Sequence, residues 1–130
     1  MRVQSYSDVI IGEYPHAEDF GRELKPILEN EVFTVGHTNV KATIHTHWNF
    51  LPDHPEVIRF KKFITEEVDK HFNPLPIQGE LTSNVLQHEF WGNVYCKGDY
   101  ADPHDHIPNS VSLVYFLKSK WYFSPLVFSD

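Results

Sequence analysis

Two histidines and an aspartate stand together late in this sequence, at His104, Asp105 and His106. They occupy a short loop with a proline on each side and precede residues 111–117, an apolar stretch that is typical of a buried strand. On an extended segment, positions 104 and 106 project from the same side. Imidazole nitrogens suit Fe, Zn, Cu and Ni, so the loop is a candidate site for a divalent metal.

The pattern leaves the ligand set open. A metal site with two histidines and one carboxylate on one face usually carries His-x-Asp as its local half. Here His106 stands where that carboxylate is expected, and Asp105 lies between the histidines. Either His106 replaces the carboxylate, or Asp105 turns inward as the ligand. The structural alternative is a solvated turn with an Asp–His hydrogen bond, because short motifs often match by chance.

Helical periodicity predicts two helices in the first half of the chain. Residues 15–29 place apolar side chains on one face, and Pro26 is expected to kink or split that helix. A second helix is expected to begin at Asp53, which forms a capping-box pattern with Glu56, and to end before residues 73–76. Its apolar positions recur at helical spacing: Val57, Phe60, Ile64 and Val68.

Strand-like patterns dominate the second half. Residues 38–48 alternate apolar and polar side chains, and residues 82–96 form one long strand-like segment or two in succession. Residues 111–117 and 126–128 follow as further strands. Helices first and antiparallel strands later predict an α+β fold, with residues 1–130 as a single domain.

Period-two alternation assigns faces within residues 82–96. Trp91, Asn93 and Tyr95 fall on one face, and Phe90 and Val94 fall on the other.

Composition excludes several classes of protein. Eighteen acidic residues against eleven Lys and Arg give a net charge of -7, which makes nucleic acid an unlikely partner. One cysteine, Cys96, permits neither an intrachain disulfide nor a cysteine-built zinc site. The first residues lack a signal-peptide core, and no apolar run reaches transmembrane length. We therefore expect a cytoplasmic protein with no membrane partner.

Five short runs occur in a continuous order. They are Trp91-Gly92-Asn93-Val94-Tyr95, Lys97-Gly98-Asp99-Tyr100, Pro103-His104-Asp105-His106, residues 112–117 and residues 124–130. In this order, residues 90–130 resemble the iron- and 2-oxoglutarate-dependent oxygenases of the double-stranded β-helix fold, notably the small ones of marine phages and bacteria. Residues 39–72 resemble the strand–helix lead-in of that family more loosely.

The resemblance implies a fold, an activity and a site. The fold would be N-terminal helices packed on the leading, partial half of a jelly-roll or cupin-like antiparallel sheet. The activity would be a dioxygenase reaction that hydroxylates a C–H bond. Fe(II) would be held by His104 and His106, with Asp105 as the alternative ligand. The cosubstrate 2-oxoglutarate would lie near Tyr95 and Tyr115, with help from Asn93. If the chain is phage-encoded, its place would be the host cytoplasm.

The chain also departs from the family pattern. A distal histidine and a basic residue for the 2-oxoglutarate carboxylate should follow, but no histidine comes after His106, and the only later basic residues are Lys118 and Lys120. We therefore expect a fragment that lacks both elements.

Two alternatives stay open beside an active oxygenase. The chain could be a non-catalytic binding protein on the same scaffold, with an exposed sheet edge that pairs with another copy or another chain. It could be an oligomer in which a neighbouring subunit supplies the missing ligand. His45 and His47 form a second His-x-His, which is more typical of strand-end packing than of a metal site. The substrate is not specified by the sequence.

Overall fold

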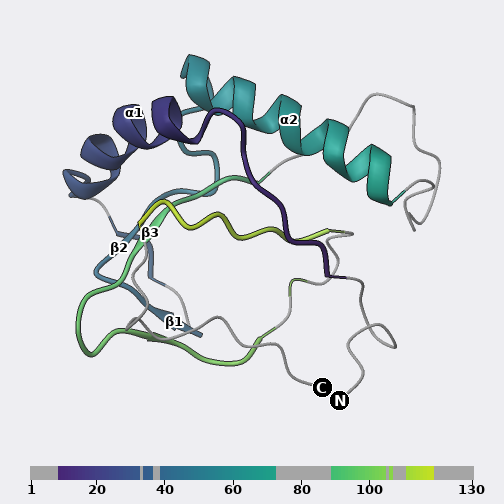
Figure 1. Cartoon of the computed structure of the whole chain (residues 1–130). Coiled ribbons are helices and arrows are strands. Elements are labelled where there is room, and N and C mark those ends of the chain that lie inside the picture. Colours follow the sequence, from purple (N-terminus) through teal and green to yellow (C-terminus); the bar gives the residue numbers. More distant parts are fainter. Residues whose placement is uncertain are drawn as a thin grey trace.

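The computed structural model describes residues 9–32, 34–36, 39–72, 89–104, 106 and 111–118. Two helices lie together on one side of the molecule, with short strands below them (Figure 1). The helices are α1 (Ala17–Glu29) and α2 (Pro55–His71), and the strands are β1 (Val40–Lys41), β2 (Ile44–His45), β3 (Asn93–Val94) and β4 (Tyr100–Ala101). The expected α+β class is confirmed. None of the helices in this described part has the length and apolar character needed to cross a bilayer.

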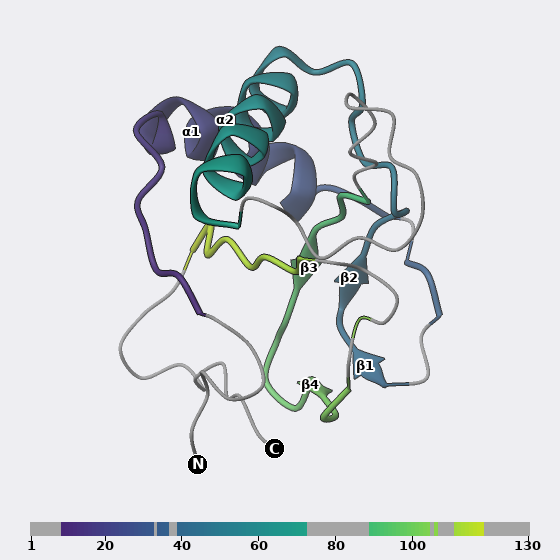
Figure 2. The same cartoon turned by 90° about the vertical axis from the view of Figure 1, so that its right-hand side faces the viewer.

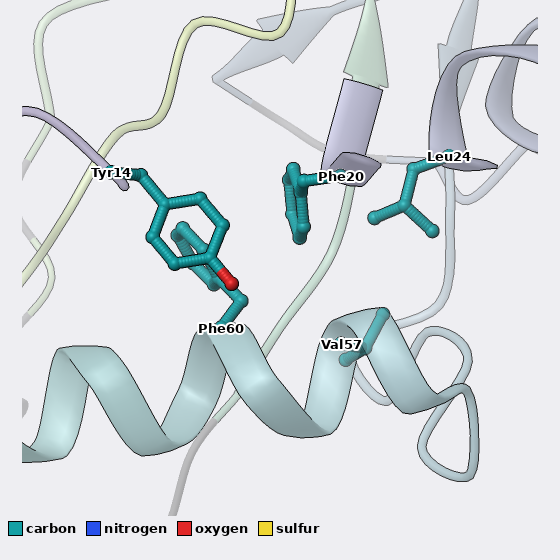
Figure 3. Packing of buried hydrophobic residues seen from close by; sticks show 5 residues of the cluster. All are labelled: Tyr14, Phe20, Leu24, Val57 and Phe60. Atoms are coloured by element: carbon teal, nitrogen blue, oxygen red, sulfur yellow. The ribbon is translucent and has the colours of Figure 1, made fainter. Parts of the chain in front are cut away.

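The core lies between the two helices and the chain that precedes α1. Phe20 from α1 stacks on Phe60 from α2 with ring centres 4.6 Å apart, and each side chain is only 3% exposed. Tyr14 packs edge-on against both rings, and Leu24 and Val57 complete the cluster (Figure 3). Burying a side chain of this size contributes about 1.5–3 kcal/mol. The apolar faces predicted for both helices are confirmed.

Helix α1 runs through Pro26 without being split. Pro26 lies in the last turn of the helix, so its missing N–H costs only one late hydrogen bond. The carbonyl of Pro26 then accepts two hydrogen bonds from Asn30, from the backbone N–H at 3.1 Å and from the side-chain amide at 2.7 Å. These bonds close the C-terminal end of the helix.

The N-cap of α2 differs from the prediction by one residue. Pro55 is the first helical residue, because its fixed φ suits the first turn and its missing N–H is not needed there. The N-cap is therefore His54, whose extended conformation is usual before proline. Its Nδ1 accepts a hydrogen bond from the Glu56 backbone N–H at 3.1 Å. The capping box assigned to Asp53 and Glu56 was wrong.

The single strand predicted for residues 38–48 is also wrong, because the segment divides into β1 and β2. Strand β1 pairs with β4, and β2 pairs with β3, both antiparallel (Figure 2). The division falls at Thr43, whose backbone N–H donates to the Val94 carbonyl at 2.9 Å while its hydroxyl donates to Asp99 at 2.6 Å. These two bonds bend the chain between the two pairs.

The alternation predicted around β3 is confirmed. Phe90 and Val94 pack on the buried clusters, while the Asn93 side-chain amide donates to the Tyr95 hydroxyl at 3.1 Å. The predicted turn after β3 is present: Gly98 has a φ of 92°, which favours glycine, and Asp99 N–H donates to the Cys96 carbonyl at 2.9 Å. Residues 82–88 lie outside the described residues.

Residues 111–118 pass beneath the helices (yellow in Figure 1) and send Tyr115 and Leu117 into the buried clusters. The strand predicted for residues 111–117 does not join a sheet in the part of the chain that the structure describes. The strand predicted for residues 126–128 lies outside that part.

Candidate functional site

The antiparallel register of β2 and β3 separates a core side from a second side. Ile44 lies opposite Val94, and both face the buried cluster. His45 lies opposite Asn93, so these two side chains share the other face, because directly opposed residues in an antiparallel pair point the same way. Trp91, two residues before Asn93, is on this face as well.

Ring contacts extend this face to the candidate metal loop. Trp91 contacts His106 with ring centres 6.1 Å apart, and His106 contacts His104 with ring centres 5.0 Å apart. We call the set that these contacts and the β3 alternation define the histidine face: His45, Trp91, Asn93, Tyr95, His104 and His106.

His104 and His106 have the spacing of two ligands to one metal. Two imidazoles that bind the same ion through nitrogens at about 2.0–2.1 Å have ring centres about 4.5–5 Å apart. The observed separation is 5.0 Å, with an interplanar angle of 70°. His104 is exposed and His106 is half-buried. The separation of the two rings therefore equals that of neighbouring ligands of one divalent cation, and the His104 ring is open to solvent.

The tautomer of His104 is fixed by a backbone carbonyl. Its Nδ1 lies 2.6 Å from the Asp102 oxygen, which can only accept, so Nδ1 carries a proton and, in the neutral ring, Nε2 carries the lone pair. Asp102 is held in turn by a 2.6 Å bond from its backbone N–H to the Asn39 carbonyl. Metal-ligating histidines commonly have this arrangement, in which a carbonyl orients the ring through the nitrogen that does not bind.

The loop is anchored by the turn that precedes β4. Asp99 accepts hydrogen bonds from the Cys96 backbone N–H at 2.8 Å and from the Thr43 hydroxyl, and it pairs with Lys41 at 3.3 Å. These contacts, led by the Cys96 N–H, lower the pKa of Asp99 to about 2. The charged carboxylate thus ties the chain just before His104 to the segment between β1 and β2.

The residues expected near 2-oxoglutarate lie in different places. Tyr95 is 48% exposed on the histidine face, beside Asn93. The Oδ1 atom of Asn93 is buried and has no hydrogen-bond partner within the described part of the chain. Tyr115 instead lies on the helix side among Tyr14, Phe20 and Phe60, where burial raises the pKa of its hydroxyl.

No third ligand candidate joins His104 and His106 within the described residues. Asp105 lies outside the described residues. Among those that the structure describes, no group of three or more His, Cys, Asp and Glu side chains is gathered closely enough to hold a metal ion. His45, from the second His-x-His, is 3% exposed, and its Nδ1 donates to the Thr46 carbonyl at 2.8 Å. Of the predicted ligands, the described chain therefore brings together His104 and His106.

No pattern in the sequence connects Trp91 with the loop that carries His104 and His106. Its ring lies beside His106 and also beside His45, at 6.2 Å and nearly parallel. Alternation along β3 had put Trp91 on the face of Tyr95. The contact with His45 depends on the β2–β3 register, which no local pattern encodes.

Comparison with protein-family models, with curated proteins and with solved structures gives no match for this chain.

Proposed function

We propose that this chain is an Fe(II)- and 2-oxoglutarate-dependent oxygenase domain in which His104 and His106 are metal ligands. The observation that carries the proposal is the 5.0 Å separation of these two rings, together with the carbonyl that gives His104 its metal-binding tautomer. The ordered runs of residues 90–130 support the same family. A reaction on a C–H bond would use the oxidising chemistry that the metal and 2-oxoglutarate supply when bound.

The histidine face offers groups for the cosubstrate. The Tyr95 hydroxyl accepts a hydrogen bond from Asn93, which leaves its own proton to donate to a carboxylate. The Asn93 Oδ1 has no partner in the described chain, and an unsatisfied buried acceptor costs about 1–3 kcal/mol unless a ligand or water pairs with it. Tyr95 and Asn93 would therefore orient 2-oxoglutarate. Asp105 stays the alternative to His106 as the second metal ligand.

The same proposal includes the fold. Two antiparallel pairs, β1–β4 and β2–β3, join the segment around residue 40 to the segment around residue 95, below a layer of two helices. This pairing of distant short strands supports the leading half of a double-stranded β-helix, with the N-terminal helices covering its core side.

Anaerobic titration with Fe(II), with and without 2-oxoglutarate, tests the metal site. We expect the parent chain to bind Fe(II), and the double variant His104→Ala/His106→Ala to lose that binding. The matched control is His16→Ala/His71→Ala, which removes two exposed histidines from the helix side of the molecule. If the loop variant binds Fe(II) as tightly as the parent, the proposed site is wrong. Protein-dependent release of succinate would establish turnover.

One observation favours a second candidate, a protein that self-associates through strand pairing. Residues 111–118 form no backbone hydrogen bond in the described structure, although Tyr115 and Leu117 are packed inward. Leu113, Val114 and Phe116 are 51–58% exposed. An unpaired, apolar extended segment of this kind is a template for adding a strand.

The partner that fits this segment is a second copy of the chain. Residues 107–117 contain no charged side chain, so antiparallel pairing of two copies centred on Val114 brings no like charges together. It would place Ser112 opposite Phe116 and Leu113 opposite Tyr115 of the other copy. Such a pair would be two-fold symmetric, as most homodimers are.

Sedimentation of the parent and of Val114→Pro tests this candidate, because proline removes the central backbone donor. A dimer that becomes a monomer in the variant supports strand pairing, and a monomeric parent rejects it. Metal stoichiometry adds one distinction. One Fe(II) per two chains would indicate a metal on the two-fold axis that takes ligands from both subunits.

A further inference from the structure

Trp91 lies next to His106, the member of the candidate metal pair whose ring has no hydrogen bond within the described residues. His104 is oriented by the Asp102 carbonyl. The described chain provides no such hydrogen bond to the ring of His106, whose ring neighbours are Trp91 at 6.1 Å and His104 at 5.0 Å. A histidine ring that no hydrogen bond orients must be oriented by packing if it is to bind a metal tightly. A freely rotating ring would lose conformational entropy on binding, which lowers the affinity.

The backbone on both sides of Trp91 is fixed. Phe90 N–H donates to the Trp48 carbonyl at 2.8 Å on one side. On the other side, Thr46 N–H donates to the Gly92 carbonyl at 3.0 Å, and Gly92 N–H donates to the Thr46 hydroxyl at 3.0 Å. Trp91, which precedes β3, is thus held in place by bonds from its two neighbours to the segment that follows β2.

The Trp91 ring is also supported by His45. The two rings are nearly parallel, at 6° with centres 6.2 Å apart. His45 is itself buried and held by its bond to the Thr46 carbonyl. Within the described residues, His45 and His106 make no ring contact with each other, whereas Trp91 contacts both. His45 therefore supports Trp91 and is not placed as a third ligand.

We propose that Trp91 is a positioning residue for the metal site, which holds the imidazole of His106 in the orientation needed to bind together with His104. This inference rests on the proposed function, because it takes the two histidines as ligands. Loss of an outer partner of a metal ligand typically weakens metal binding about 10–100-fold. An aromatic replacement should preserve the contact, and an aliphatic one of similar bulk should not.

The test is anaerobic Co(II) titration of the parent and of Trp91→Phe, Trp91→Leu and Trp48→Phe, with folding verified by circular dichroism. We expect Trp91→Leu to bind Co(II) at least about 10-fold more weakly, with an altered visible absorption spectrum. We expect Trp91→Phe to stay close to the parent. Trp48→Phe is the matched control, since Trp48 contacts His45 but not the metal pair.

Tryptophan emission gives a second measurement, which does not depend on Trp91→Leu, the variant most exposed to a loss of folding stability. Bound Co(II) should quench the emission of the parent and of Trp48→Phe, and Trp91→Phe should lose most of that quenching. Equal Co(II) affinity in Trp91→Leu and the parent, or undiminished quenching in Trp91→Phe, would overturn the positioning role while His104 and His106 remained ligands. Binding that survives His104→Ala/His106→Ala would instead overturn the proposed function itself.

Discussion

The Thr43 hydroxyl donates a 2.6 Å hydrogen bond to the Asp99 carboxylate across 56 positions of the sequence. The same carboxylate accepts from the Cys96 N–H and pairs with Lys41. It therefore joins the turn after β3 to the bend between β1 and β2, a few residues before the loop with His104. The folding stability that this junction contributes should therefore depend on pH.

Asp99→Asn should lower the melting temperature at neutral pH, and this difference should disappear in acid. The folded-state pKa of about 2 lies below the ordinary value of 3.8, because three donors favour the charged form. A depressed pKa stabilises the fold above 3.8, and this contribution is lost as the pH falls from 3.8 to about 2. Thermal unfolding from pH 7 to pH 2 measures it. Asp53→Asn, at an exposed position, should follow the parent, and a constant difference for Asp99→Asn would contradict the explanation.

Gly92→Ala should destabilise the protein by about 1–3 kcal/mol through overpacking. A Cβ at this position would lie 2.8 Å from Leu28 Cδ1, and Leu28 is buried, so neither side chain can move without disturbing the core. Urea denaturation measures the loss. Gly36→Ala is the control, since nothing lies within 4 Å of its added carbon.

A double-mutant cycle then locates the clash. Leu28→Ala alone should cost about 2–5 kcal/mol, but combining it with Gly92→Ala should cost less than the sum of the two. Strict additivity would show that the two side chains do not meet.

His54→Ala should cost about 0.5–2 kcal/mol, because the Glu56 N–H loses its acceptor at the start of α2. His54→Ser should restore most of the loss, since a serine hydroxyl caps the same position. The matched change is His16→Ala at the start of α1, where the N-cap side chain accepts no capping hydrogen bond. Equal costs for the two alanine variants, measured by thermal unfolding, would refute the capping role of His54.

Tyr95→Phe and Tyr115→Phe should separate the two tyrosines expected near 2-oxoglutarate. A hydrogen bond to a charged group contributes about 1.5–3 kcal/mol, so Tyr95→Phe should weaken 2-oxoglutarate binding to the Fe(II)-loaded protein about tenfold or more. Tyr115→Phe should leave that affinity unchanged, because the Tyr115 ring is packed among Tyr14, Phe20 and Phe60. Calorimetric titration with 2-oxoglutarate measures both. A larger effect in Tyr115→Phe would reassign the cosubstrate to the helix side.

The helices could be predicted because their signals are local. Phe20 and Leu24 lie on one face of α1, and Val57 and Phe60 lie on one face of α2. The structure buries all four side chains. The N-cap was misplaced by one residue because Asp53 satisfies the capping-box pattern, whereas the fixed φ of Pro55 decides where the helix starts.

The strands could be predicted only in part, because pairing depends on distant residues. Alternation correctly separated Trp91 from Phe90, but it could not show that residues 38–48 bend at Thr43, since the cause is a carboxylate far along the chain. The proximity of His104 and His106 follows from their spacing. The position of Trp91 between His45 and His106 follows from the β2–β3 register, which alternation alone does not set.

The strand pairs also determine when the candidate site can form. Both pairs join segments roughly fifty to sixty positions apart, and such non-local contacts form late, because closing the loop costs entropy before any contact is gained. The helices with their local turns can form earlier. At a synthesis rate of about 5–20 residues per second, several seconds pass between the synthesis of β2 and that of β3. The order of translation thus keeps His45 without its sheet partner until shortly before the loop with His104 and His106 is made. The histidine face is therefore among the later parts of the described structure to assemble.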